Sequence, residues 1–435
     1  TERQYFVITS TPRLALLGSA GTSQIPWTWR QDYSVLWFPY RVDGKGQGEV
    51  VFVGLGPLPR TARPVDPYRA LLNLSLEGKI VLVPDRQTYD SLRRQCPMAG
   101  ALIVSEDPRE LGSAALGGAM VYDYFVTDRP SRPRHPVLLI RPEVAASLLE
   151  GSGTSLADLE KQVGRLEAGE TLVRPLGREV ALEVEGSPCR ARARNVLGYL
   201  PGGTGTSGAG QERRNYAYQM DDQVIVLMVP YDGTGIGPDG TVFPGAQDGA
   251  TGPATLIELA RSWSQADYRP KRTFLFVAYA GQGLDPNHSN RQVPSPSEFL
   301  GVKAGFREFK VWAVFHLSRL GDITGRRLAV DTASVRLGSL LVQAARRSGV
   351  GVLRIESILD LEAIQEGAQS FMGTVIGWQQ EEEGRFTAAS VYWHSADPVW
   401  GTDKDTVANV SATSLQKAGR AISLALMVLG REWSY

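Results

Sequence analysis

Five polar side chains in the second half of the chain follow apolar segments or precede a helix, and their three residue types all occur in hydrolytic sites. They are Asp232, Asp248, His316, Ser318 and His394. Carboxylates and imidazoles are the usual protein ligands of catalytic zinc, whose bound water also needs a carboxylate base. A serine close to a histidine and an aspartate would instead allow nucleophilic attack by an activated hydroxyl. The residues around each position discriminate between these two chemistries.

The serine chemistry has little support in the surrounding sequence. His316 lies two residues before Ser318 on an expected strand, so both side chains point to the same face. Together with Asp248 and His394 they could line one cavity. However, no Gly-x-Ser-x-Gly turn, which exposes a catalytic serine between a strand and a helix, surrounds Ser318. The sequence therefore argues against a new serine hydrolase.

Residues 223–283 resemble the co-catalytic zinc aminopeptidases of the aminopeptidase Y, glutamate carboxypeptidase and transferrin receptor type. An apolar strand ends in Pro-Tyr-Asp at 230–232, and a loop reads Pro-Gly-Ala-Gln-Asp-Gly at 244–249. A helix through Trp263 and a second apolar strand follow, the latter running into Gly-Gln-Gly at 281–283. In that family the corresponding motifs read His-x-Asp, Gly-Ala-x-Asp and Glu-Glu. The resemblance implies the family's scaffold with altered chemistry.

The resemblance also implies that most of the metal site has been replaced. Pro230 stands at the first histidine ligand and Gly283 at a glutamate ligand, and neither side chain offers a ligand atom. Ser318 stands at an aspartate ligand within a segment that resembles the family's Asn-x-Asp-x-x-Gly motif. Gln282 stands at the general base, and an amide does not accept a proton near neutral pH. We expect neither a catalytic residue nor a bound metal.

Three positions of the family's site are retained. Asp248 corresponds to the carboxylate that bridges both metals, His394 to the last histidine ligand, and Asp232 to the Asp of His-x-Asp. They could hold a single metal ion, and zinc is expected only in that case. Structural roles are the favoured explanation, because Asp is common before a helix and in Asp-Gly turns. His394, flanked by tryptophans, fits a hydrogen-bonded and half-buried histidine.

Alternating apolar and amphipathic segments predict the elements that position these residues. Strands are expected near 224–229, 274–279, 311–317, 352–356 and 373–378, and helices near 251–264, 334–347 and 411–430. This alternation predicts an α/β fold with a mostly parallel sheet covered by helices. The resemblance implies that the central sheet is mixed and the fold zinc-exopeptidase-like.

The N-terminal half has a different character. A Val-rich strand at 48–56, a strand and helix after it, and Ala-Gly-Ala-Leu-Ile-Val at 99–104 resemble a protease-associated domain, which the family commonly inserts before its core. We therefore predict a segment at 1–45 that packs on the core, a β-rich protease-associated domain at 46–175 and an aminopeptidase-like domain at 176–435.

Composition excludes some functions. Lys+Arg and Asp+Glu both total 46, so no overall charge favours nucleic acid. No apolar run reaches the roughly 20 residues that span a bilayer. Cys96 and Cys189 could form one disulfide or remain buried thiols. The chain begins at Thr1, which suggests a processed form, and an extracellular or cell-surface location is expected.

Together these features predict a catalytically inactive homologue of a zinc aminopeptidase, a pseudoenzyme. Transferrin receptor and nicastrin show that proteins with the family's scaffold can have functions that do not involve peptidase chemistry. We expect a binding, structural or assembly role with a protein partner or in self-assembly. The alternative is a divergent metallo-aminopeptidase or other hydrolase with a rebuilt, reduced metal site.

Overall fold

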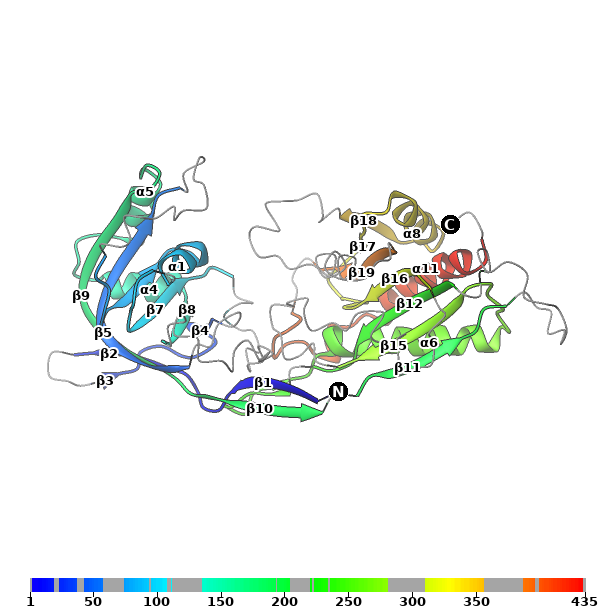
Figure 1. Cartoon of the computed structure of the whole chain (residues 1–435), viewed down its shortest axis with the longest axis horizontal. Helices are drawn as coiled ribbons and strands as arrows, with labels where there is room; N and C mark the ends of the chain where they lie inside the picture. The colour runs from blue at the N-terminus through cyan, green and yellow to red at the C-terminus, as the bar shows by residue number, and fades with distance from the viewer. Residues whose placement is uncertain are drawn as a thin grey trace. The chain divides into compact units, whose positions relative to one another are not determined.

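The structure is a computed structural model of the chain, and it falls into two compact units. It describes residues 2–18, 23–36, 43–57, 74–93, 95–107, 111, 135–192, 194–203, 220, 223–233, 235–280, 310–355, 386–395 and 399–432. The first unit comprises Thr1–Glu2, Arg192–Gly235 and Val242–Tyr435, and the second comprises Arg3–Ala191 and Ile236–Thr241 (Figure 1). Within these residues no helix combines the length and apolar character needed to cross a bilayer.

A seven-stranded mixed sheet forms the centre of the first unit (Figure 1). Its order is β11 (Val196–Leu200), β15 (Thr273–Tyr279), β12 (Gln223–Pro230), β16 (Lys310–Leu317), β19 (Thr387–His394), β17 (Arg327–Asp331) and β18 (Gly351–Ile355). Strands β15, β12, β16 and β19 run parallel to one another. Only the pairings of β11 with β15 and of β17 with β19 are antiparallel. The predicted mixed, mostly parallel sheet is therefore confirmed.

Three described helices pack on one face of this sheet. They are α6 (Thr251–Gln265), α8 (Val335–Arg347) and α11 (Ala412–Arg431). Serines set two of the helix starts, since Ser334 and Ser411 accept hydrogen bonds from backbone N–H groups of the first turn. The apolar faces of the helices and alternate residues of the central strands form one core, with Trp263 packed against Phe274 and Phe276.

The opposite face of the sheet carries the intervening residues of the same strands. Val226, Met228, Val277 and Val314 form a smaller buried cluster there. Because side chains alternate along a strand, Tyr279 and His316 also lie on this second face. Two short elements follow β12, the hairpin β13 (Gly235–Ile236) with β14 (Val242–Phe243), and a π-helical turn η4 (Ala246–Ala250) that runs into α6. A 3₁₀ turn, η5 (Val407–Asn409), precedes α11.

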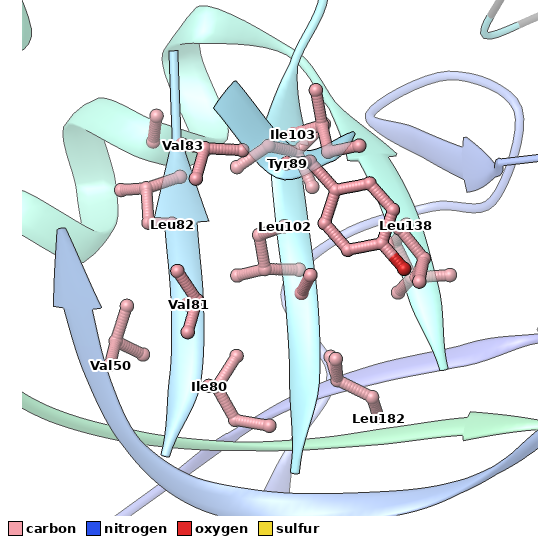
Figure 2. Packing of buried hydrophobic residues seen from close by; sticks show 14 of the residues in the cluster. Val50, Ile80, Val81, Leu82, Val83, Tyr89, Leu102, Ile103, Leu138 and Leu182 are labelled. Atoms are coloured by element: carbon pink, nitrogen blue, oxygen red, sulfur yellow. The ribbon is translucent and has the colours of Figure 1, made fainter. Parts of the chain in front are cut away.

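The second unit contains an eight-stranded sheet. Its order is β3 (Ser23–Gln24), β2 (Arg13–Leu17), β9 (Thr171–Val184), β5 (Gly44–Leu55), β6 (Ile80–Val83), β7 (Gly100–Val104), β8 (Val137–Ile140) and β4 (Tyr33–Val35). Helices α1 (Arg86–Leu92), α4 (Pro142–Leu149) and α5 (Leu156–Val163) accompany it, and β1 (Glu2–Ile8) pairs with β10 (Gly186–Arg192). Figure 2 shows the aliphatic side chains of β6, β7 and β8, such as Leu82, Leu102 and Leu138, packed together.

Most predicted elements of the first unit are present within one or two residues of their expected bounds. The strand expected near 373–378 lies outside the described residues. Strands β17 and β19 were not predicted. Strand β17 is short and lies between arginines and an aspartate, so its apolar centre spans only Leu328–Val330. The assignment of residues 46–175 to a protease-associated domain, and the boundaries drawn around it, stay predictions.

Candidate functional site at the carboxyl edge of the sheet

The residues singled out from the sequence lie where parallel strands end. Pro230 ends β12, Ser318 directly follows β16, and His394 ends β19. Because these three strands are parallel, their carboxyl ends lie at one edge of the sheet, where α/β proteins commonly bind ligands. The sheet therefore brings the Pro230–Asp232 segment, Ser318 and His394 to a common edge.

Asp248 is brought to this edge by the turn η4. Its backbone N–H donates a hydrogen bond to one carboxylate oxygen of Asp405 at 3.2 Å, and the N–H of Gln247 donates to the other at 2.7 Å. The next residue, Gly249, packs so closely on Asp232 that a Cβ there would lie 2.9 Å from the Asp232 carbonyl oxygen. Asp232 and Asp248 are thus held on adjoining backbone segments. The Oδ1 atom of Asp248 is buried and has no hydrogen-bond partner in the described part of the chain.

Asp405 is a site residue that the sequence analysis missed. It is fully buried and closes the start of η4 from a segment 157 residues away. Burial, with smaller contributions from the carboxylates of Asp248 and Asp322, raises the pKa of its carboxyl to about 6 although the two backbone hydrogen bonds lower it. No local motif marks Asp405, because its role depends on a long-range contact. The region around Asp248 is therefore rich in carboxylates.

Ser318 and Arg319 form the turn after β16. The Ser318 backbone N–H donates to Val391 in β19, and its side chain is fully buried with no hydrogen-bond partner for Oγ among the described residues. Arg319 adopts a φ of 50°, in the left-handed region that non-glycine residues rarely occupy. Its guanidinium carbon lies 5.3 Å from the ring centre of Tyr392 and 4.3 Å from that of Trp400, within cation–π range.

His316 belongs to a buried polar chain instead of a serine–histidine couple. Its Nε2 lies 3.0 Å from the Tyr279 hydroxyl and its Nδ1 lies 3.4 Å from Ser390 Oγ. Burial raises the pKa of Tyr279 well above its usual value, and the charges of Asp232 and Asp248 raise it further. Tyr279 therefore stays protonated and neutral at ordinary pH. Since Ser318 Oγ has no partner, the geometry supplies no activated serine.

His394 shares a strand face with Ser390 and Tyr392 by the alternation along β19. Its backbone pairs with Arg327 in the antiparallel neighbour β17, and its side chain is half-buried. Gln282 and Gly283, which stand at the base and ligand positions implied by the resemblance, lie outside the described residues. The sequence gives the identities of these two residues, and the described structure does not give their positions.

The described residues do not fit a pair of zinc ions. No group of three or more His, Cys, Asp or Glu side chains within the described ranges is arranged to hold a metal. The Pro230 side chain offers no ligand atom, the Ser318 hydroxyl is not among the usual zinc ligands, and Arg319 adds a positive charge next to Ser318. Zinc prefers tetrahedral sets of imidazole, thiolate and carboxylate ligands, and a guanidinium beside such a set opposes cation binding.

Comparisons with known proteins point to one enzyme family. Residues 212–282 match the model of peptidase family M28. A search of the curated proteins gave no match. Among solved structures, an aminopeptidase from Aneurinibacillus sp. strain AM-1 is 16% identical with a TM-score of 0.59, covering 99% of this chain and 83% of its own.

Two further structures agree. BSAP, a zinc aminopeptidase from Bacillus subtilis, is 14% identical with a TM-score of 0.51, covering 100% of this chain and 86% of its own. A peptidase M28 precursor from Shewanella amazonensis SB2B is 13% identical with a TM-score of 0.55, covering 100% and 84%. Identities this low show a shared fold and leave the activity open. The family match over residues 212–282 and the shared fold together confirm the resemblance, and the chain has the fold of the zinc aminopeptidases.

Proposed function

We propose that this chain is a non-catalytic homologue of the zinc aminopeptidases that acts by binding. The observation that carries the proposal is the composition of the strand ends. Pro230 and Ser318 replace two ligands of the family's site, and the sequence places Gln282 and Gly283 at the base and at a third ligand. A hydrolase of this type needs both metal ligands and a carboxylate base to activate water. The chain keeps the scaffold and lacks most of that set.

The test is metal content together with activity. The protein is dialysed against excess zinc, then against metal-free buffer, and assayed by elemental mass spectrometry. We expect less than about a tenth of an equivalent of zinc, a level typical of adventitious binding. We also expect no cleavage of aminoacyl p-nitroanilides above the buffer blank.

A matched variant keeps this test informative. Combining P230H, Q282E, G283E and S318D restores all four replaced positions, and zinc uptake by this variant alone would show that the wild-type side chains abolish the site. Stoichiometric zinc in the wild type, with cleavage that a chelator abolishes, would contradict the proposal. That result would favour the alternative, a divergent hydrolase with a reduced metal site at Asp232, Asp248 and His394.

Location and partners are part of the same proposal. An extracellular or cell-surface location and a protein partner or self-assembly would match the non-peptidase members of the family. Sedimentation equilibrium of the purified chain tests self-assembly, and fractionation of the producing cells tests the location. A chain that stays monomeric would contradict self-assembly, and a chain found only inside cells would contradict the location.

A further inference from the structure

We propose that the carboxyl edge of the seven-stranded sheet binds a small zwitterion, a free α-amino acid, through Asp248, Ser318 and Arg319. In this arrangement Asp248 Oδ1 accepts a hydrogen bond from the ammonium group. Ser318 Oγ and Arg319 Nε donate to the carboxylate. The inference rests on the proposed function, since it assigns a metal-free ligand to the same site.

The first support is a set of buried polar atoms that lack partners. Asp248 Oδ1, Ser318 Oγ and Arg319 Nε are all shielded from solvent and form no hydrogen bond in the described part of the chain. Ser318 as a whole is fully buried. Folded proteins leave few buried polar atoms unpaired, because each costs the full desolvation of the group. Three such atoms at one sheet edge indicate that something else satisfies them.

The second support is their proximity. The Leu320 backbone N–H donates to Thr251 Oγ1 at 2.9 Å, and a Cβ on Gly252 would lie 2.8 Å from the Leu317 carbonyl oxygen. The turn that carries Ser318 and Arg319 therefore packs on the first turn of α6, three residues after Asp248. The charges of Asp248 and Arg319 also both act on the Tyr279 hydroxyl, the first raising and the second lowering its pKa.

The third support is that an acidic and a basic side chain on segments that pack together each keep an unpaired polar atom. Asp248 Oδ1 and Arg319 Nε both lack a hydrogen-bond partner within the described ranges. The Arg319 guanidinium carbon lies 5.3 Å from the ring centre of Tyr392 and 4.3 Å from that of Trp400, so both rings are within cation–π range. A guanidinium edge matches a carboxylate, and a carboxylate oxygen accepts well from an ammonium group. A ligand with both groups on neighbouring atoms satisfies both charges at once.

The test uses calorimetric titration of the full-length, chelator-treated chain. A thermal-shift panel of the common amino acids first selects the side chain. The chosen amino acid is then titrated beside its N-acetyl derivative, which lacks the ammonium group, and its amide, which lacks the carboxylate. We expect each derivative to bind roughly 10- to 100-fold more weakly, the usual effect of losing one charge-assisted hydrogen bond.

Two variants assign the contacts. Arg319→Gln should weaken the amino acid and leave its amide unaffected, while Asp248→Asn should weaken the amino acid and leave the N-acetyl derivative unaffected. Arg420→Gln, on the exposed side of α11, is the matched control and should bind like the wild type. Because the derivatives are tested on the wild type as well, a variant that fails to fold does not end the test.

Several results would overturn the inference. They are a wild type that binds no amino acid of the panel, binding that tolerates both derivatives equally, and binding that appears only after zinc is added. Zinc content measured on the same sample separates the two proposals. Stoichiometric zinc with peptide cleavage defeats the proposed function, whereas a metal-free chain that binds no amino acid defeats only this inference.

Discussion

Ser318 carries a fully buried hydroxyl whose oxygen has no hydrogen-bond partner among the described residues. An unpaired buried polar group costs about 1–3 kcal/mol, so Ser318→Ala should raise the free energy of unfolding by about 1 kcal/mol in the absence of ligand. Urea denaturation measures this difference. Ser390→Ala is the matched control, since Ser390 Oγ lies 3.4 Å from His316 Nδ1 and its loss should destabilise slightly. A loss of stability in Ser318→Ala would mean that the hydroxyl is satisfied.

His135 makes the stability of the second unit dependent on pH. It is buried, with Nε2 3.1 Å from the Tyr89 hydroxyl, and burial followed by the charge of Arg93 lowers its pKa from 6.5 to about 4. The unfolded chain therefore binds a proton between these values that the folded chain does not. This contribution is complete above pH 6.5 and is lost as the pH falls towards 4, by up to about 3 kcal/mol.

Urea denaturation between pH 4 and 7.5 tests this expectation on the wild type and on His135→Gln. The variant is expected to be less stable at pH 7.5 but to lose less stability on acidification. Parallel pH profiles for the two proteins would show that the pKa of His135 is the same in the folded and the unfolded chain.

At the scale of the helices and strands, the packing of the end of helix α11 depends on a buried arginine. The Arg272 guanidinium donates to the carbonyl oxygens of Leu429 and Glu432 at the end of α11 and to Gln223 Oε1 at 2.7 Å. It also lies 4.7 Å from the Trp312 ring centre, and burial lowers its pKa only to about 10, so it stays charged at neutral pH. Arg272 thus joins the last helix to strands β12 and β16.

Arg272→Met should lower the free energy of unfolding by about 2–4 kcal/mol, because it leaves buried carbonyl oxygens without their charged donor. Thermal denaturation followed by circular dichroism measures the loss, with exposed Arg420→Met as control. Equal melting temperatures for the two variants would show that water replaces the guanidinium.

The elements themselves were largely predictable, and the reason is local. Strands such as Gln223–Pro230 and Thr273–Tyr279 are runs of β-branched and aromatic residues, and α11 has a clear apolar stripe. The direction of each strand in the sheet could not be predicted from these local patterns. The antiparallel β17 enters the sheet between β19 and β18, and that choice depends on the path of the whole chain.

The site was predictable only where a residue occupies a family position. Asp232, Asp248, Ser318 and His394 were singled out because motif spacing marks them, and their part in a site stays a prediction. Arg319, Asp405 and Tyr279 were missed, because their importance comes from contacts between segments far apart in sequence and from backbone conformation. Residues that belong to no family motif have no characteristic spacing in the sequence, so they cannot be detected in this way.

At the scale of the whole molecule, charge balance sets behaviour in solution. The chain carries 46 basic and 46 acidic residues, and its isoelectric point is near 6.9. Proteins near zero net charge repel one another least, so self-association should be strongest near pH 7 and weaken at pH 5.5 and 8.5. Light scattering across this range measures it. Association that is constant with pH would instead indicate a specific interface.

The left-handed backbone conformation of Arg319 predicts which residues laboratory evolution would select at this position. Its left-handed backbone costs roughly 1–2 kcal/mol for any side chain except glycine, with asparagine the least affected of the others. A library selected only for survival at high temperature should therefore enrich glycine or asparagine at position 319. A library selected for ligand capture should retain arginine. The residue found at position 319 would then show whether the variants had been selected for stability or for ligand binding.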